Sequence, residues 1–437
     1  LVFFFFFNFN KTEVLLLTFG MLLGMLIFKT LMIHPDNTQL MDKAVKLVQT
    51  DEWTHYGNRS TKVGSIPGSF LTAVTGLPMK IYFSPWSAMA VILIFHLISY
   101  LLLRKVGFLI QENLSVLLLL LIFWLNPWRV EQSELYNPAY LFLFATVHLW
   151  TALSMKHKNF WLTFVHVLAL GFCFQTHFSF LILAIVSFLM FVTGQLKVHW
   201  RGFFVGTFII VLSLVPYILS PYFNSAGVEE NIDLAKSDAF LGRNFVLVYP
   251  VIKSLIYFFR MGSMYFGRHI FSEIQFDWIT NSLLNLIVTN IFHILKWILA
   301  AGSLILSFYL IGRFLKRIQW KTFFKFNQAL KENPRDRFLN YFVFSFVAVF
   351  VAASLSPVEF NHWHFILCFP VISLFIVVEI QNQIQSQAQK YQISTKWIWS
   401  LILVFVLWDV FAALGSRSHS FKNDYETDFY KHYQIQK

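Results

Sequence analysis

The sequence predicts an all-α, polytopic membrane protein, and two observations carry this prediction. The first is composition: of 437 residues, 57% are hydrophobic and only 13% are charged, and the mean hydropathy is +0.61. A soluble globular protein carries more charge and has fewer long apolar runs. The second is a series of apolar runs, several of them near the roughly 20 residues that cross a bilayer core as a helix. We therefore expect one membrane domain over residues 1–437.

The apolar run from Val14 to Ile33 is the first predicted transmembrane helix. Its length of about 20 residues, at about 1.5 Å per residue, matches a bilayer core of roughly 30 Å and exceeds the apolar segment of a cleavable signal peptide. Further spans are predicted at 86–103, 114–128, 138–154, 159–174, 178–193, 202–220, 282–312, 339–356, 364–380 and 397–414. The sequence thus predicts about eleven transmembrane helices.

Basic side chains gather in alternate loops of this map, which indicates its orientation. The basic loops lie around Arg104, Lys156, Lys197, Lys390 and the segment 313–338, and they hold sixteen basic residues against three acidic ones. The opposite loops, at 34–85, 126–137, 175–177, 221–281 and 357–363, hold eleven basic and thirteen acidic residues. Because cytoplasmic loops carry the excess of Lys and Arg, the first set is predicted to be cytoplasmic.

The large polar loops 34–85 and 221–281 then share the outer face with the C-terminal tail. The net charge of +12 follows from the basic loops, so the distribution favours a membrane topology over a nucleic-acid partner. We expect an integral protein of a bacterial inner membrane, in contact with membrane lipids and with its working face outside.

An amphipathic helix is predicted within the first outer loop, over residues 36–53. One side holds the apolar residues Leu40, Met41, Ala44, Leu47 and Val48, and the other holds Asp42, Lys43, Lys46 and Gln49. This spacing is typical of a helix that lies on a membrane surface. Asp36, directly after Pro35, stands at the start of this helix and close to the outer membrane surface.

Two roles for Asp36 follow from this position. Aspartate at a helix start with Gln39 three residues later is a variant of the capping box, which needs no catalysis. A carboxylate at the outer membrane surface can also meet a lipid-linked substrate on one side and a hydroxyl acceptor on the other. The residues alone favour the helix cap over the catalytic role.

Five stretches in a fixed order carry a family resemblance. They are Asp36 to Trp53, IPGSF at 66–70, NPWRVEQSELYNPAYL at 126–141, GFCFQTHFSFLIL at 171–183 and NHWHFILCFP at 361–370. Together they resemble the GT-C superfamily of membrane glycosyltransferases, in particular the family 39 type that includes protein O-mannosyltransferases and lipid A aminoarabinose transferases. The first stretch is similar to the first outer loop of that family, where an acidic residue after the first span opens a helix.

The resemblance implies a function: transfer of a sugar from a polyprenyl-phosphate carrier to a lipid, glycan or protein acceptor on the outer face. It implies that Asp36 is the general base and that cations compensate the leaving phosphate. The implied substrate-binding residues are Asp42, Arg59, Lys62, Arg129, Glu134, Asn137, His177, His362 and His364, and Arg243, Arg260 and Arg268 are further outer cations.

The chain departs from the family pattern at two positions. Asn37 follows the first acid, and Asn137 stands where related enzymes carry a second acid, although Asp42, Glu131 or Glu134 could substitute. We predict no metal site and no cofactor besides the lipid-linked sugar donor, and leave divalent metal open. His362 and His364 flank Trp363 either as a metal pair or, as is more common, as an interfacial belt. His177 either touches a headgroup or caps a helix.

Two other functions are compatible with the same map. A transporter or flippase for a lipid-linked or polyanionic substrate would need paired charges near the membrane midplane, and only Lys296 and Asp409 could supply them. A non-catalytic assembly partner would retain the fold without the activity. The first prediction remains the glycosyltransferase.

Overall fold

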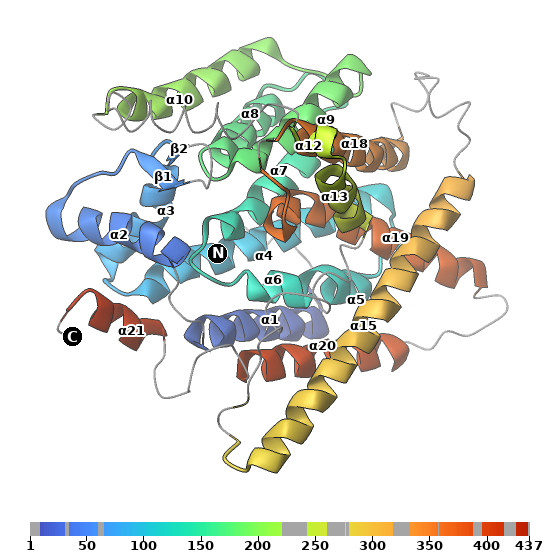
Figure 1. Cartoon of the computed structure of the whole chain (residues 1–437). Helices are drawn as coiled ribbons and strands as arrows, with labels where there is room; N and C mark the ends of the chain where they lie inside the picture. Colours follow the sequence, from blue (N-terminus) through green and yellow to red (C-terminus); the bar gives the residue numbers. More distant parts are fainter. Residues whose placement is uncertain are drawn as a thin grey trace.

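The computed structural model describes residues 9–30, 35–59, 65–220, 243–259, 276, 279–317, 333–356, 358–387, 396–414 and 425–435. These residues are almost entirely helical (Figure 1). Six helices are long and apolar enough to cross a membrane: Lys11–Thr30, Pro85–Ile110, Trp200–Ile218, Ser282–Lys316, Pro334–Leu355 and His362–Gln385. The all-α membrane class is confirmed, whereas a count of eleven crossings stays a prediction.

Every predicted span overlaps a helix or a pair of consecutive helices. In chain order these are α1 (Lys11–Thr30), α4 (Pro85–Ile110), α5 (Val116–Leu119) with η2 (Leu120–Trp124), η3 (Asn137–Tyr140) with α7 (Leu141–Ser154), α8 (Phe160–Phe174), η4 (Phe178–Phe180) with α9 (Leu181–Val192), α10 (Trp200–Ile218), α15 (Ser282–Arg317), α18 (Pro334–Leu355), η5 (His362–Cys368) with α19 (Phe369–Gln387), and α20 (Lys396–Leu414). Several of these helices are shorter than a helix that spans a bilayer. The presence of a helix at a predicted span therefore does not by itself show that the helix crosses the membrane.

Three helices begin with a polar residue followed by proline. The side chains of Ser84, Asn126 and Asn333 each accept a hydrogen bond from the backbone N–H two residues later. Proline fits the first helical position because the N–H it lacks would have no partner within the helix, and the polar side chain satisfies another orphan donor. These dipeptides therefore set the starts of α4, α6 (Pro127–Glu131) and α18.

The first polar loop folds as a helical pair with a small hairpin. In α2 (Pro35–Thr50) the residues Leu40, Met41, Ala44 and Leu47 are buried. They face α3 (Phe70–Ile81), so closely that a Cβ on Gly76 would lie 2.7 Å from the Leu47 side chain. The apolar face of the predicted amphipathic helix is thus covered by protein, which corrects the expectation that it lies on the membrane. The helix also ends at Thr50, short of the predicted residue 53.

The hairpin is an element that the sequence did not indicate. Its strands β1 (Tyr56–Arg59) and β2 (Ser65–Pro67) pair antiparallel, with Tyr56 opposite Pro67 and Arg59 opposite Ser65. The strands are too short to show an alternating apolar pattern. Their consequence is local, because β1 lies against the start of α2 and supplies side chains to it.

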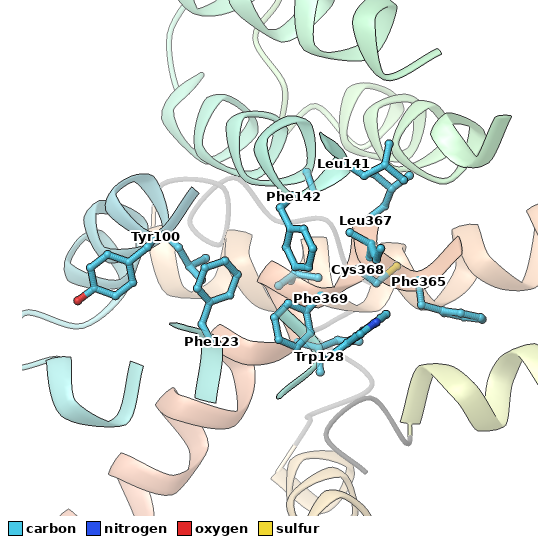
Figure 2. Packing of buried hydrophobic residues seen from close by; sticks show 14 of the residues in the cluster. Tyr100, Phe123, Trp128, Leu141, Phe142, Phe365, Leu367, Cys368 and Phe369 are labelled. Atoms are coloured by element: carbon cyan, nitrogen blue, oxygen red, sulfur yellow. The ribbon is translucent and has the colours of Figure 1, made fainter. Parts of the chain in front are cut away.

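The core is aromatic, and Phe369 lies at the centre of one cluster (Figure 2). Its ring centroid lies 5.5 Å from that of Phe123, 5.1 Å from Trp128 and 5.7 Å from Phe142. Edge-to-face and offset contacts of this kind add to the burial of large apolar surfaces. They join η2, α6, α7 and α19, so the short helices are fixed by packing rather than by length.

The polar loops of the predicted outer face converge at one end of the helices. The Asn37 amide donates to the Leu135 carbonyl at 2.8 Å, joining the loops 34–85 and 126–137. The last helix, α21 (Tyr425–His432), reaches the same end, since Ser84 Oγ donates to Glu426 Oε1 at 2.8 Å. In Figure 1, α21 lies near α2 at the same edge. The first loop and the C-terminal segment therefore share one side, as predicted.

The basic loops meet at the opposite end. Arg104 pairs with Glu13 at 2.9 Å between Nε and Oε1, and Arg337 donates to the Gln195 carbonyl at 2.7 Å. The backbone N–H of Lys197 donates to Met155 at 3.2 Å. The last two contacts bring together the loops near Met155, Lys197 and Arg337, while residues 318–332 and the Lys390 loop lie outside the described residues. The assignment of that end to the cytoplasm continues to rest on the charge count.

Candidate active site

Asp36 lies in the first turn of α2, directly after Pro35, and is half-buried. An acidic side chain in this turn interacts favourably with the positive end of the helix dipole. Gln39 does not pair with it as a capping box would require, because the Gln39 side-chain oxygen accepts from the backbone N–H of Arg59 at 2.8 Å. That bond ties β1 to α2 instead.

Two further bonds fix the backbone around Asp36. The Asn58 amide donates to the Asp36 carbonyl at 3.0 Å from the side of β1. The Asn37 amide donates to the Leu135 carbonyl at 2.8 Å from the other side. The first turn of α2 is thus held between two other segments, and the carboxylate of Asp36 projects from a fixed backbone.

Lys43 is buried beneath this turn, although its place in the sequence put it on the polar face. Its Nζ donates to the Gln39 carbonyl at 2.8 Å and to Asn58 Oδ1 at 3.3 Å, and lies 5.8 Å from the centroid of the Tyr56 ring. Burial lowers the pKa of Lys43 to about 8, and the nearby Asp42 carboxylate opposes this shift. Lys43 therefore helps to hold the Asn58 side chain, which in turn holds the backbone of Asp36.

Tyr136 brings two carboxylates together. Its pKa is raised, first by burial and then by the negative charges of Asp36 and Glu134. The Glu134 charge also acts on Tyr425 of α21. Asp36 and Glu134, which are far apart in sequence, therefore both act electrostatically on the same phenol, and Glu134 lies three residues before Asn137, where the family pattern has a second acid.

The site continues through the next two loops. The Asn137 amide donates to the Thr176 carbonyl at 3.1 Å, which places the turn at 175–177 beside the segment that carries Tyr136. The next residue, His177, lies against His364 of η5, with ring centroids 5.2 Å apart and planes at 79°. Asn137, His177 and His364, three of the residues implied by the resemblance, are thus brought into one continuous arrangement.

Lys253 on α13 (Tyr249–Phe259) adds a cation that the resemblance did not single out. Its Nζ lies 2.8 Å from Glu359 Oε2 and 3.5 Å from Asn361 Oδ1, and its charge acts on His364. A lysine that interrupts an otherwise apolar segment of the outer loop was the signal that could have found it. We use the name polar row for Asp36, Glu134, Tyr136, Asn137, His177, His364 and Lys253.

The other residues implied by the resemblance lie away from the polar row or outside the described residues. Asp42 accepts a hydrogen bond from Tyr433 at 2.7 Å, and Arg59 is exposed on β1. The ring of His362 lies 4.7 Å from that of Trp363. Lys62, Arg260 and Arg268 lie outside the described residues, and Arg243 is described only as the first residue of α12 (Arg243–Leu247).

Arg129 is fully buried, which places it apart from the outer surface. Its Nε donates to the Trp124 carbonyl at 2.7 Å and its Nη2 to the Gly20 carbonyl at 3.2 Å, while its guanidinium lies 4.1 Å from the Trp124 ring centroid. Its charge acts on buried Asp409 of α20. This geometry indicates that Arg129 stabilises the helix packing.

Metal ligands do not cluster in the described part of the chain: no group of three or more His, Cys, Asp or Glu side chains there could hold an ion. In the polar row, the Nδ1 atoms of His177 and His364 already accept hydrogen bonds from backbone N–H groups at 3.1 and 2.9 Å. The row itself supplies two carboxylates, a phenol, an amide, two imidazoles and an ammonium group.

Comparisons with known proteins rest on structure alone, since no family model and no curated protein matches the sequence. Two structures of ArnT from Cupriavidus metallidurans are similar to this chain. The apo form has a TM-score of 0.51 at 11% identity over 90% of this chain and 61% of ArnT. The form bound to undecaprenyl phosphate has a TM-score of 0.53 at 10% identity over 92% of this chain and 75% of that one.

An oligosaccharyltransferase, AglB from Archaeoglobus fulgidus, aligns over 98% of this chain at a TM-score of 0.44, too low to argue a shared fold. The likeness to ArnT does support one. ArnT is a lipid A aminoarabinose transferase of the GT-C type, and its fold is the one that the sequence resemblance implied. This chain accordingly shares its fold with ArnT.

Proposed function

We propose that this protein is a membrane glycosyltransferase that moves a sugar from a polyprenyl-phosphate donor to a hydroxyl of a lipid, glycan or protein acceptor. The proposal includes eleven crossings, cytoplasmic basic loops, and a polar row on the outer face of a bacterial inner membrane. The observation that carries it is Asp36: a half-buried carboxylate on a backbone held by two other segments, at the end where the outer loops converge. The ArnT-like fold and the undecaprenyl phosphate bound to ArnT support the donor class.

The reaction needs a base at the acceptor and compensation of charge at the leaving group. The Asp36 carboxylate takes the proton from the acceptor hydroxyl. At the same time the oxygen of that hydroxyl forms a bond to the anomeric carbon of the sugar. The bond from that carbon to the phosphate oxygen breaks, and the polyprenyl phosphate leaves with the electron pair. A positioned base contributes roughly 10²- to 10⁴-fold to such a step.

The remaining groups of the polar row divide between the two ends of this reaction. The charges of Asp36 and Glu134 both act on Tyr136, so in this proposal Glu134 and Tyr136 bind or orient the acceptor near the base. Lys253 lies at the other end of the row, where its ammonium group counters the developing phosphate charge through water or directly. Its pairing with half-exposed Glu359 is weak enough to be exchanged for a phosphate.

The test is release of free polyprenyl phosphate from a labelled lipid-linked sugar by the purified protein in lipid nanodiscs. Wild type should release it, and Asp36→Asn should lower the rate roughly 10²- to 10⁴-fold while folding normally. Asparagine keeps the size and shape of the side chain but replaces one acceptor oxygen with an N–H donor, so it cannot act as the base. A folded Asp36→Asn protein that transfers sugar at the wild-type rate would remove Asp36 from the chemistry.

A panel of donors and a flipping assay separate this proposal from a transporter. If no lipid-linked sugar donor releases its carrier phosphate while wild type stays folded, the transferase proposal fails. Flipping of a fluorescent lipid-linked substrate that survives in Asp36→Asn and Glu134→Gln would instead support a flippase.

A further inference from the structure

The protons on the two imidazoles of the polar row are fixed by their neighbours. His177 Nδ1 accepts from the backbone N–H of Ser179 at 3.1 Å and lies 2.8 Å from Ser179 Oγ. A backbone N–H can only donate, so Nδ1 must present its lone pair. The ring proton of neutral His177 is therefore on Nε2.

His364 reaches the same tautomer by a different route. Its Nδ1 accepts from the backbone N–H of Asn361 at 2.9 Å, as part of a reciprocal capping box at the start of η5. Its Nδ1 also lies 3.1 Å from the Asn361 carbonyl, but that carbonyl already accepts from the backbone N–H of His364. Only a lone pair on Nδ1 satisfies the Asn361 N–H, so the His364 proton is also on Nε2.

Both Nε2–H groups are available to a ligand. Within the described chain neither makes a hydrogen bond, and neither is among the fully buried polar atoms that lack a partner, so both reach the surface. The rings themselves are held firmly: His177 is half-buried, His364 is 7% exposed, and His364 stacks on Phe360 at 4.7 Å between centroids. Two imidazole rings, each held by a bond to its Nδ1, thus lie edge to face with centroids 5.2 Å apart.

We propose that the Nε2–H groups of His177 and His364 bind the phosphate of the polyprenyl carrier as neutral hydrogen-bond donors. This inference rests on the proposed function and names the phosphate end of its site. Phosphate oxygens only accept hydrogen bonds, so they match a pair of donors better than sugar hydroxyls, which also need acceptors. The charge of Lys253, which acts on His364, favours an anion at the same place.

Neutral imidazoles suit this role because the donors are already in position before the phosphate gains charge. Burial lowers the pKa of His177 to about 4, so the ring is uncharged at neutral pH. Donors that are pre-oriented in a partly buried site stabilise developing negative charge without reorganising. Lys253 supplies the compensating positive charge, and the two histidines orient the phosphate through their hydrogen bonds.

The experiment measures binding of undecaprenyl phosphate and of undecaprenol, which lacks the phosphate, to the full chain in phosphatidylcholine nanodiscs. His177→Asn and His364→Asn can keep the acceptor at the Nδ1 position, and hence the local caps, but lose the Nε2 donor. His177→Gln and His364→Gln place an amide N–H near the Nε2 position. Exposed His157 on the basic side provides the matched control, His157→Asn.

Each asparagine variant is expected to weaken undecaprenyl phosphate binding about tenfold or more, because a hydrogen bond to a charged group is lost. The glutamine variants should recover part of that loss, while undecaprenol binding and His157→Asn should be unchanged. Binding that survives a chelator supports donors that need no metal.

Three results overturn the inference. One is unchanged binding of undecaprenyl phosphate in the asparagine variants, with a raised KM for the sugar-linked donor, which would assign the histidines to the sugar. Another is an equal loss of undecaprenyl phosphate binding in the asparagine and glutamine variants, which would show that the two histidines have only a structural role. The third is loss of binding with a chelator. Wild type that binds undecaprenyl phosphate but transfers no sugar would sink the transferase proposal and leave this site standing.

Discussion

Asn58 joins β1 to the first turn of α2: its amide donates to the backbone carbonyl of Asp36 at 3.0 Å. The other half of the same amide accepts from buried Lys43 at 3.3 Å. One side chain that is 3% exposed therefore connects the proposed base to a buried cation. Neither contact is with substrate, so Asn58 is a positioning residue.

Asn58→Ala should lower kcat roughly tenfold or more with little change in KM, because a small displacement of a catalytic group costs rate rather than ground-state binding. The measurement is steady-state release of polyprenyl phosphate. Asn159→Ala is the matched control, since Asn159 Oδ1 accepts from Leu162 at 2.9 Å at the start of α8 on the basic side. Equal kinetics in both variants would mean that Asn58 contributes only to stability.

Lys43→Met should stabilise the protein at neutral pH, because removing the buried charge raises the free energy of unfolding by on the order of 2 to 4 kcal/mol. The loss of the hydrogen bonds to Gln39 and Asn58 offsets part of this gain. The pKa of Lys43 is about 8 in the folded chain against 10.5 for an ordinary lysine. Between those values the unfolded chain holds more protons, so wild-type stability rises with pH from about 8 to 10.5. Below pH 8 the penalty is constant.

The check is thermal unfolding in nanodiscs across pH 7 to 11, with Lys46→Met as a control on the same helix, because Lys46 is exposed and pairs with Glu52. The rise between about 8 and 10.5 should disappear in Lys43→Met. A rise of the same size in both variants would place the titrating group elsewhere. Lys43→Met should also lose turnover, since Asn58 loses its partner, so stability and activity should move in opposite directions.

Arg129→Met should destabilise the fold by roughly 1 to 3 kcal/mol, because it leaves the buried Trp124 and Gly20 carbonyls without their donor. Asp409→Asn tests whether the buried Asp409 interacts with Arg129 at all. If the two act as a pair, the double variant should lose less stability than the sum of the single variants. Additive losses in a double-mutant cycle would show that Arg129 serves only its carbonyls.

The helices and the grouping of the loops could be predicted because both depend on local patterns. The length of an apolar run predicts a transmembrane helix, and the charge of alternate loops predicts on which side of the membrane each loop lies. Neither prediction depends on what the helix packs against. The same reasoning placed Lys43 on an exposed polar face, although it is buried. Its burial depends on the β1–β2 hairpin, whose strands are too short to be predicted from the sequence. The reasoning also could not separate Arg129 from the true outer cations, because sequence position fixes the loop and not the depth.

The polar row shows the same limit. Asp36, Asn137, His177 and His364 were found through a family resemblance, but nothing in their spacing says that they meet. Lys253 was passed over because an isolated lysine in an apolar segment is more often a charge at the membrane interface than a site residue. Which residues meet is decided by tertiary packing, here by loops that join helices far apart in the chain.

Gly68 links two parts of the site. It lies in the turn between β2 and α3 with φ of +91°, and a Cβ there would lie 2.2 Å from the side-chain oxygen of Gln175. Gln175 is buried and donates to Ser213 at 2.7 Å, so its side chain has little freedom to move away. Only glycine combines this backbone conformation with so close an approach.

Gly68→Ala should therefore cost stability twice: about 1 to 2 kcal/mol for the positive φ and a further 1 to 3 kcal/mol for crowding against Gln175. The double variant Gly68→Ala/Gln175→Ala should recover the crowding part and keep the backbone part. Gly302→Ala is the control, because nothing lies within 4 Å of a Cβ there and alanine favours the helix.

The functional consequence of Gly68→Ala reaches His177 through the turn at 175–177. Displacing Gln175 moves the backbone that Asn137 holds through Thr176, and with it the imidazole two residues away. Binding of undecaprenyl phosphate should weaken in Gly68→Ala and return in the double variant, whereas Gly302→Ala should bind as wild type does. If Gly68→Ala is destabilised as expected yet binds undecaprenyl phosphate with wild-type affinity, then the turn holds His177 independently of β2, and the first loop contributes only Asp36 to the site.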